Sequence, residues 1–226
     1  MQIGKINLDF LGHSGFLIKY ANNEHVKIIA IDPYNIPDVK EKADFILITH
    51  SHYDHCSIKD IIKLARKGTT LIIPADVQSK ITHIDSVQME TLESGEGLDL
   101  GIIKIEALPA YNVNKKFHTK KDNWLGYIIK IKETIIFHAG DSEVIPEYDK
   151  LTGYAKQGNN FIVLLPVSGT YVMSAEEAAD LAAKLKPTLA IPMHFGAGVS
   201  GTDADAQLFV KLCHEKSIKA QILPKI

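Results

Sequence analysis

A short segment from Thr49 to His55 carries side chains that bind metal ions. It reads Thr-His-Ser-His-Tyr-Asp-His, so that three imidazoles and one carboxylate lie close together, namely those of His50, His52, Asp54 and His55. Neutral imidazole and carboxylate are ligands of Zn²⁺ and of related divalent ions. The segment follows the apolar run 45–48, which is typical of a buried strand. We therefore predict a metal site at the end of this strand, in preference to a histidine cluster held only by hydrogen bonds.

The spacing of these residues suggests two ion positions. Alternate residues of an extended strand point the same way, so His50 and His52 can reach one ion if the extended geometry continues past Thr49. Asp54 and His55 lie where the chain turns towards the next helix, and they can face a second ion. A catalytic ion needs about three protein ligands besides water, and two-metal sites hold their ions ~3.5–4 Å apart. Further ligands must therefore come from elsewhere in the chain.

Two candidates for these ligands also follow predicted strands. Asp141 lies in a glycine-containing turn after the strand 134–137, and His194 follows the strand 189–191. At strand ends a rigid sheet positions the side chains while the loops leave access to them. Taken alone, Asp141 would be interpreted as a turn residue and His194 as a hydrogen-bonded loop histidine. Together with the first motif, we predict both as metal ligands.

Hydrophobic periodicity predicts the elements that position these residues. Ser57 is predicted to cap a helix that ends near residue 66, and a capping box formed by Ser174 and Glu177 opens a helix through residue 186. A last helix is predicted at 203–215. Two strand-rich halves, each followed by helices, indicate two sheets with helices outside them. Strands are predicted at 3–10, 16–20, 26–31, 45–49, 70–73, 100–108, 124–131, 134–137, 161–165, 189–191 and 220–223.

The composition is that of an ordinary globular protein. The 226 residues include 46% hydrophobic and 23% charged residues, with a net charge of −2, which excludes gross disorder and a global basic field for nucleic acid. The N-terminus has no pattern of a secretory signal, and the longest apolar stretch, around residues 161–167, is too short to span a bilayer. Two cysteines far apart in the sequence do not indicate a disulfide framework. We expect a soluble cytoplasmic protein with reduced thiols.

In their order along the chain, the three motifs resemble the metallo-β-lactamase superfamily over essentially the whole sequence. The segments Gly12 to Phe16 and Ile31 to Pro33 also fit this family. The resemblance is greatest to the small metal-dependent hydrolases that include the ascorbate phosphate lactonases. It implies an α/β fold in which residues 1–226 form a single four-layer αββα sandwich. The metal site would then lie on one edge, between two mixed sheets that have helices outside them.

The resemblance also implies a role for each ligand. His50 and His52 would bind the first metal, while Asp54, His55 and His194 would bind the second and Asp141 would bridge the two. This family usually supplies a third histidine to the first metal, from the loop after the strand that matches 100–108.

The chain departs from the family pattern in that loop, because Asn112 stands where the third histidine is expected. An Asn carbonyl is a weak oxygen ligand for Zn²⁺, and His118 offers an imidazole from the same loop. Which of the two residues completes the first site stays open at this point. We expect one or two Zn²⁺ ions, with Mn²⁺ as a competitor because oxygen-rich ligation favours it.

Other residues near these motifs have less distinctive patterns. His13 and His138 resemble positions behind the ligands, and Asp32 is a candidate to accept a hydrogen bond from a ligating histidine, although a turn residue is an equal alternative. Cys56 is interpreted as a small buried residue at the start of a helix and not as a ligand. Tyr171 is interpreted as a packing residue.

The predicted activity is hydrolysis by a metal-bound hydroxide, with Asp54 as the catalytic residue that orients the nucleophile and returns a proton to the leaving group. The expected partner is a small-molecule substrate, either a lactone or a phosphorylated ester, with no membrane partner. Lysines around the predicted site loop could attract phosphate, or form only a solvated charge run: Lys115, Lys116, Lys120 and Lys121.

Two alternative functions use the same scaffold. One is a phosphodiesterase or nuclease, against which the compact and slightly acidic chain argues, because it shows no large surface for nucleic acid. The other is a non-catalytic metal- or ligand-binding protein, which the presence of Asn112 keeps open. The sequence leaves open whether the protein is a homo-oligomer.

Overall fold

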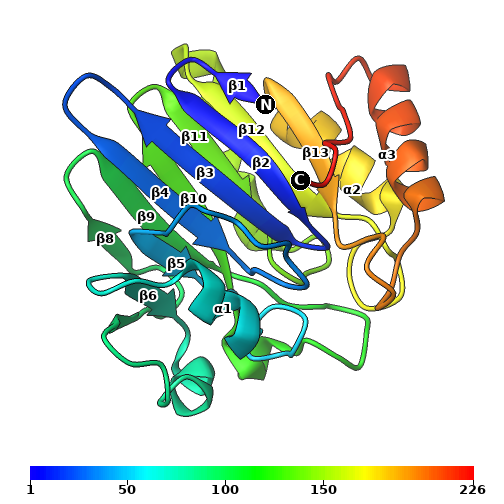
Figure 1. The fold of residues 1–226 in the computed structure, drawn as a ribbon. Coiled ribbons are helices and arrows are strands. Elements are labelled where there is room, and N and C mark those ends of the chain that lie inside the picture. The colour runs from blue at the N-terminus through cyan, green and yellow to red at the C-terminus, as the bar shows by residue number, and fades with distance from the viewer. The chain divides into compact units, whose positions relative to one another are not determined.

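Each of the two units of the chain is built on its own β-sheet (Figure 1). The computed structural model describes residues 1–226 except for the side chain of Gln157. The first unit comprises residues 1–92 and 223–226, and the second unit comprises residues 93–222. This division does not test the expectation that residues 1–226 act as a single domain, which stays a prediction.

The first unit contains a seven-stranded mixed sheet. Its first four strands pair antiparallel, whereas β4 to β7 run parallel to one another. The carboxyl ends of β4 to β7 therefore lie at one edge, and the turn from β2 to β3 lies there too, because β3 runs against β4. The strands, in their order in the sheet, are β1 (Gln2–Ile3), β2 (Ile6–Gly12), β3 (Gly15–Ala21), β4 (Val26–Ile31), β5 (Phe45–Leu47), β6 (Thr70–Ile73) and β7 (Gln88–Thr91).

The second unit repeats this construction in a six-stranded sheet. Strands β8 to β11 pair antiparallel, and β11, β12 and β13 run parallel. The carboxyl ends of β11 to β13 share one edge with the loop that joins β9 to β10. From the β13 side, the sheet contains β13 (Leu189–Met193), β12 (Asn160–Pro166), β11 (Thr134–His138), β10 (Leu125–Ile131), β9 (Ile103–Pro109) and β8 (Gly97–Asp99).

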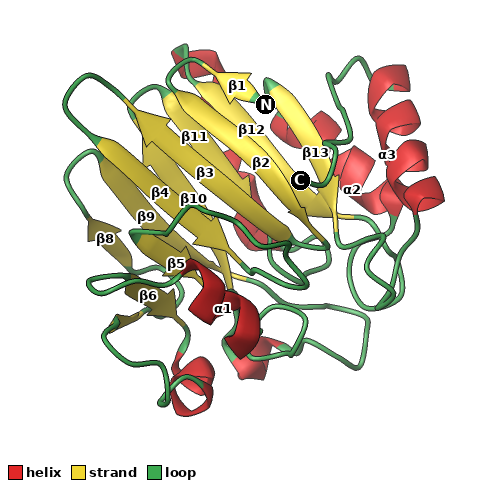
Figure 2. Cartoon of the chain, in the orientation of Figure 1, coloured by secondary structure: helices red, strands yellow, loops and turns green.

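The helices complete each unit. In the first unit, α1 (Ile58–Leu64) follows β5. In the second unit α2 (Ala175–Leu185) and α3 (Asp203–Glu215) contact each other, and Figure 2 shows them in red beside β13. Short 3₁₀ helices occur at η1 (Ala75–Lys80), η2 (Lys120–Asp122), η3 (Pro146–Leu151) and η4 (Tyr154–Gln157). None of the helices formed by the described residues combines the length and the apolar character that crossing a membrane requires.

Burial follows the sequence pattern in both units. The residues of β12 from Phe161 to Pro166 are buried, as expected for a central parallel strand covered on both faces, and all five residues of the edge strand β13 are buried as well. In the first unit, Ile61 and Leu64 of α1 belong to the same buried cluster as Leu71 and Ile73 of β6. Helix α2 begins with the predicted capping box, in which the Ser174 hydroxyl accepts from the Glu177 N–H and the Glu177 carboxylate accepts from the Ser174 N–H.

The structure corrects three of the predicted strands. The strand predicted at 220–223 is wrong, because only Ala220 makes a β-bridge, to Ala190, before Pro224 removes a backbone donor. The strand predicted at 3–10 is divided by a turn at Gly4 into β1 and β2, and the strand predicted at 100–108 starts later, at Ile103. Strands β7 and β8 were not predicted, because their mainly exposed residues lack an alternating apolar pattern.

Candidate metal centre

The sheet of the first unit brings the metal-binding motif to a single edge. Asp32 directly follows β4, and the segment from Ile48 to His55 follows β5. These strands are parallel neighbours, and the Asp32 N–H donates to the Leu47 carbonyl, 3.0 Å away. The turn from β2 to β3, which contains His13, lies at the same edge. Tertiary structure therefore joins three segments that are well separated in the sequence.

Asp32 holds the motif in place from behind. Its buried carboxylate accepts from the Thr49 N–H at 2.8 Å, from the Thr49 hydroxyl at 2.6 Å and from His55 Nδ1 at 2.8 Å. With Nδ1 engaged, His55 offers Nε2 to an ion, which is the usual arrangement of a metal-binding histidine. The geometry therefore favours the interpretation of Asp32 as the acceptor behind a ligand over that of a turn residue alone.

The donor atoms of the motif are spaced as ligands of one ion would be. His50 Nε2 lies 3.1 Å from His52 Nδ1, and His55 Nε2 lies 3.6 Å from Asp54 Oδ2. Zn–N bonds of 2.0–2.1 Å in a tetrahedron place neighbouring donors about 3.3 Å apart. The Thr49 hydroxyl lies 3.0 Å from His50 Nδ1, so the second nitrogen of His50 is also held. The donor set thus fits divalent ions.

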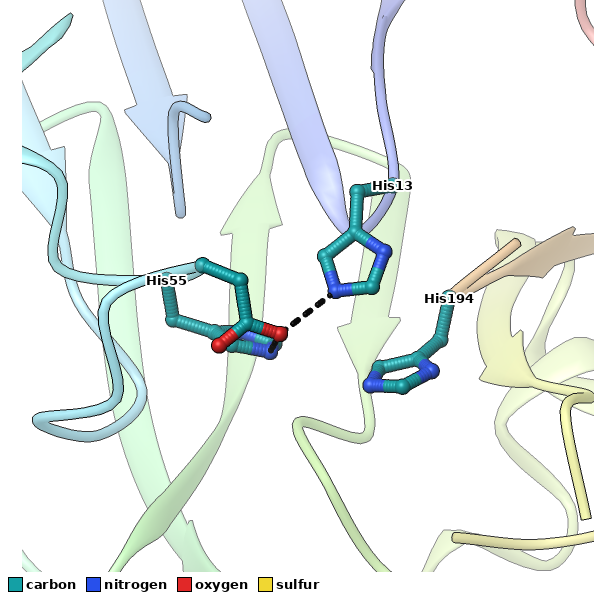
Figure 3. A group of neighbouring side chains, drawn as sticks. His13, His55 and His194 are labelled. Atoms are coloured by element: carbon teal, nitrogen blue, oxygen red, sulfur yellow. Dashed lines mark hydrogen bonds and ion pairs between the residues drawn. The ribbon is translucent and has the colours of Figure 1, made fainter. Parts of the chain in front are cut away.

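His13 contacts the motif directly. Its Nε2 lies 2.9 Å from Asp54 Oδ2, and the dashed line from His13 in Figure 3 marks this interaction. The donor atoms of His13, Asp54 and His55 all lie within 4.8 Å of one another, and all three residues are buried. His13 therefore either orients the Asp54 carboxylate or shares an ion with it.

The sheet of the second unit gathers the remaining predicted ligands. Asp141 follows β11, and His194 follows β13, as Figure 3 shows for His194. Asn112 and His118 lie in the loop between β9 and β10, which is at the same sheet edge. All four residues are buried.

Asp141 lies between two imidazoles. Its Oδ2 is 3.1 Å from His194 Nε2 and 3.6 Å from His118 Nε2. The Ser168 hydroxyl lies 2.9 Å from His194 Nδ1, and His118 Nδ1 donates to the Tyr171 carbonyl at 3.0 Å. Each histidine therefore has its Nδ1 held and its Nε2 next to the carboxylate, which repeats the arrangement of His55 in the first unit.

The side-chain amide of Asn112 forms hydrogen bonds to the backbone of two segments. Its amide nitrogen donates to the carbonyls of Phe117, at 2.8 Å, and of Tyr171, at 2.6 Å. Its backbone N–H donates to the His118 carbonyl at 2.6 Å. Asn112 thus holds the loop together, whereas His118 brings a ring nitrogen next to Asp141.

Backbone strain is present at the same positions. His13, Asp32, His118 and His194 all have positive φ angles, between 40° and 61°. L-residues rarely adopt this region, and such conformations gather at functional sites, where the surrounding structure enforces them. The sequence showed no sign of this strain.

Two residues near the motifs have structural roles. His138 Nδ1 accepts from the Gly140 N–H at 3.1 Å and so supports the turn that carries Asp141. Burial raises the pKa of the Cys56 thiol to about 11, although nearby Lys80 acts in the opposite direction. Thiols bind metals as thiolates, so the raised pKa agrees with the interpretation of Cys56 as a buried packing residue.

The four lysines named in the sequence analysis lie in the loop between β9 and β10. Lys115 donates to the Val172 carbonyl and lies 3.4 Å from Glu143. Lys120 pairs with Glu147 at 2.9 Å. Two of the four lysines are therefore engaged with protein groups, while Lys116 and Lys121 are exposed.

Comparison with known proteins decides the family. Residues 7–194 match the model of a family described as the beta-lactamase superfamily domain. This chain belongs to the metallo-β-lactamase superfamily. The fold expectation is thereby confirmed as an α/β metallo-β-lactamase fold with two mixed sheets and flanking helices.

Within the superfamily, the chain belongs to the UPF0173 group. It is 28% identical to a UPF0173 metal-dependent hydrolase of Nanoarchaeum equitans over 97% of both chains, and 32% identical to one of Thermococcus kodakarensis over 84% of both chains. The crystal structure of a candidate metal-dependent hydrolase from Parabacteroides distasonis has a TM-score of 0.80 at 28% identity, covering 96% of this chain and 92% of that one. The closer resemblance to ascorbate phosphate lactonases stays a prediction.

Proposed function

We propose that this chain hydrolyses a small-molecule substrate with the help of divalent ions held by the histidines and carboxylates described above. The observation that carries the proposal is the repeated arrangement of buried imidazoles beside a carboxylate. His55, His118 and His194 each have Nδ1 held by a protein group and Nε2 within 3.6 Å of a carboxylate oxygen. Stability alone does not call for this arrangement, whereas a divalent ion does. The curated relatives described as metal-dependent hydrolases support the same assignment.

The ligand assignment combines the family resemblance with the donor atoms. The family resemblance implies His50 and His52 as ligands of the first ion and Asp54 and His55 as ligands of the second, and it implies Asp141 and His194 as ligands in the second unit. We prefer His118 to Asn112 as the further ligand, because an imidazole binds Zn²⁺ more strongly than an amide oxygen does and because His118 Nε2 lies 3.6 Å from Asp141 Oδ2. Nitrogen and carboxylate donors together suit Zn²⁺, and Mn²⁺ is the competitor that we propose.

We propose that the Asp54 carboxylate transfers a proton from water to the leaving group. A divalent ion bound beside it would supply Lewis acidity and lower the pKa of bound water. The Asp54 carboxylate is held at 2.9 Å by His13 Nε2, so it is fixed in one orientation and can accept a proton from water and return it to the leaving group.

A carboxylic ester or lactone is the substrate class that the surroundings favour over a phosphorylated ester. Lys115 and Lys120, which could have attracted a phosphate, are bound to protein carboxylates and carbonyls. Binding a dianion would require these contacts to be broken.

Elemental analysis tests the proposal. Protein purified without chelator or an affinity metal should contain about two divalent ions per chain. The variant His118→Ala should contain about one, while Asn112→Ala should keep about two. Less than one ion in the wild type would overturn the proposal, and loss of an ion in Asn112→Ala with none lost in His118→Ala would reverse the ligand assignment.

A further inference from the structure

Two aromatic side chains are exposed directly beside the ligand loop of the second unit. Phe117 precedes His118 and is 57% exposed, and Tyr171, whose carbonyl holds His118, is 36% exposed. Their ring centroids are 5.3 Å apart at an interplanar angle of 87°. Single exposed aromatics are common on protein surfaces, but a pair in edge-to-face contact is a preformed apolar surface.

Asn112 fixes this aromatic pair in position. The two hydrogens of its amide donate to the backbone carbonyls of Phe117 and Tyr171, so one buried side chain joins the two segments that carry the rings. A neutral histidine, the residue that the family resemblance implies at position 112, has only one N–H and could not make both bonds. The departure from the family pattern at this position thus serves to hold the aromatic pair.

Two further exposed side chains in the segments that carry the candidate ligands of the second unit are apolar. Val113, directly after Asn112, is 57% exposed, and Val144, three residues after Asp141, is 38% exposed. The cations of Lys115 and Lys120 are bound to acidic residues of the protein, whereas Lys116, directly before Phe117, is exposed. Phe117 and Tyr171 therefore offer a ligand apolar surface whose burial would favour binding.

We infer that Phe117 and Tyr171 form a platform that binds an apolar group of the substrate, preferably a flat aryl ring. This inference rests on the proposed hydrolase function and narrows its substrate class to esters or lactones that carry a hydrophobic substituent. The edge-to-face pair leaves ring surface on which a third ring can stack, while the scissile carbonyl points towards the ligand cluster that includes His118.

Binding of two hydroxamates to the metal-loaded protein tests the platform without relying on turnover. Acetohydroxamate and benzohydroxamate share a metal-binding head and differ in the phenyl ring. Trp124 reports binding, because it is the single tryptophan and its ring centroid lies 5.2 Å from that of His118. The wild type should bind benzohydroxamate about tenfold more tightly than acetohydroxamate, which is the factor that one stacked ring provides.

Substitutions test which residues cause the preference for benzohydroxamate. In Phe117→Ser and in Tyr171→Ser the ratio of the two dissociation constants should fall towards one. In Asn112→Asp it should fall as well, because a carboxylate cannot donate to the two carbonyls. The matched control is Leu208→Ser, since Leu208 lies on α3 and is 36% exposed, like Tyr171, and this variant should keep the wild-type ratio.

The outcomes separate this inference from the proposed function. A wild-type ratio near one, a ratio unchanged in both aromatic variants, or no binding of benzohydroxamate would overturn the platform. A protein that takes up no divalent ion when Zn²⁺ is supplied, yet prefers benzohydroxamate through Phe117, would keep the platform and overturn the proposed metal-dependent function.

Discussion

At the scale of single residues, the ring nitrogens of the candidate ligands are held by groups that are not themselves candidate ligands. Asp32 holds His55, the Tyr171 carbonyl holds His118, and the Ser168 hydroxyl lies against His194. Each contact settles which ring nitrogen is offered, and so it removes rotational freedom that binding would otherwise have to restrict.

Replacing Asp32 should weaken metal binding although Asp32 is not a proposed ligand. In Asp32→Asn one oxygen becomes a donor, which cannot accept from both the Thr49 hydroxyl and His55 Nδ1. We expect the affinity for the ion to fall about 10- to 100-fold, as is common for such partners. Competition with a chelator of known affinity measures this change. Wild-type affinity in a folded Asp32→Asn protein would show that His55 is not oriented by Asp32.

Replacing Asp54 should affect turnover more strongly than it affects folding. The variant Asp54→Asn keeps the shape of the side chain but cannot take up a proton, so kcat on an activated ester should fall about 10²- to 10⁴-fold. Thermal unfolding and metal content, measured on the same sample, control for loss of the fold or of an ion. Unchanged kcat would reject Asp54 as the proton-transferring group.

Because the thiol of Cys213 is buried, we expect the free energy of unfolding to fall at alkaline pH. Burial raises the pKa of Cys213 from 9.0 to about 12, with Lys216 acting in the opposite direction. The thiol ionises more readily in the unfolded chain, so its contribution is fully present below pH 9 and is lost as the pH rises towards 12. The free energy of unfolding should fall by about 1.4 kcal/mol per pH unit for this proton, within that window.

Urea unfolding at pH 8, 9.5 and 10.5 checks this expectation. The variant Cys213→Ala should show a shallower decline than the wild type, although it starts from a lower stability because of the small cavity. Parallel declines in the two proteins would mean that Cys213 does not titrate differently in the folded and unfolded states.

At the scale of elements, both sheets use the same device. Parallel strands end at a common edge of their sheet, and the candidate ligands follow soon after these ends: His50 after β5, Asp141 after β11 and His194 after β13, with Asp32, the acceptor behind His55, after β4. The backbone of each sheet is hydrogen-bonded up to that edge, so the loops begin from fixed points. The loop between β9 and β10 is longer and needs further anchoring.

Glu143 supplies that anchoring. Its buried carboxylate accepts from the N–H groups of Val113 and Asn114, both at 2.7 Å, and lies 3.4 Å from Lys115. Burial by itself would raise the pKa of Glu143, but these N–H groups and the ammonium outweigh it and lower that pKa. Its stabilising effect is therefore present above the ordinary carboxyl pKa and is lost as the pH falls below it.

The variant Glu143→Gln should loosen the loop that carries His118. The glutamine side chain would place an NH₂ group where a carboxylate oxygen accepts from two backbone N–H groups. We therefore expect the free energy of unfolding at pH 7 to fall by about 1–3 kcal/mol, and the affinity for the first ion to fall as well. Thermal unfolding and metal titration followed by Trp124 fluorescence measure both effects. Glu106→Gln is the control, since Glu106 forms a partly exposed ion pair with Lys130, and such pairs contribute little to stability. Equal effects in the two variants would reject the anchoring role.

At the scale of the whole molecule, bound ions would stabilise the native chain. An ion that binds only the folded protein stabilises it by about 2.7 kcal/mol at a hundredfold excess over its Kd. Removal of metal by a chelator should therefore lower the Tm by several degrees, and added Zn²⁺ should restore it. In the variant Asp141→Asn, which removes a proposed ligand, this difference should shrink. An identical Tm with and without metal would contradict metal binding by the folded protein.

The sequence alone was sufficient to predict the family, most of the strands and the positions of most candidate ligands. The reason is local, because apolar runs mark the strands and polar donors follow them directly, as at His50 and Asp141. Edge strands such as β7 were missed, since their side chains are exposed and carry no such pattern.

Only the tertiary structure shows how Asn112 and His118 are held, while the choice between them as a ligand stays a prediction. The Tyr171 carbonyl, more than fifty positions away in the sequence, accepts from the Asn112 amide and from His118 Nδ1. The partner of His55, Asp32, is likewise brought to it by the parallel pairing of β4 and β5. Donor types and strand ends are encoded locally, whereas the orientation of each donor depends on contacts between distant segments, which no local pattern contains.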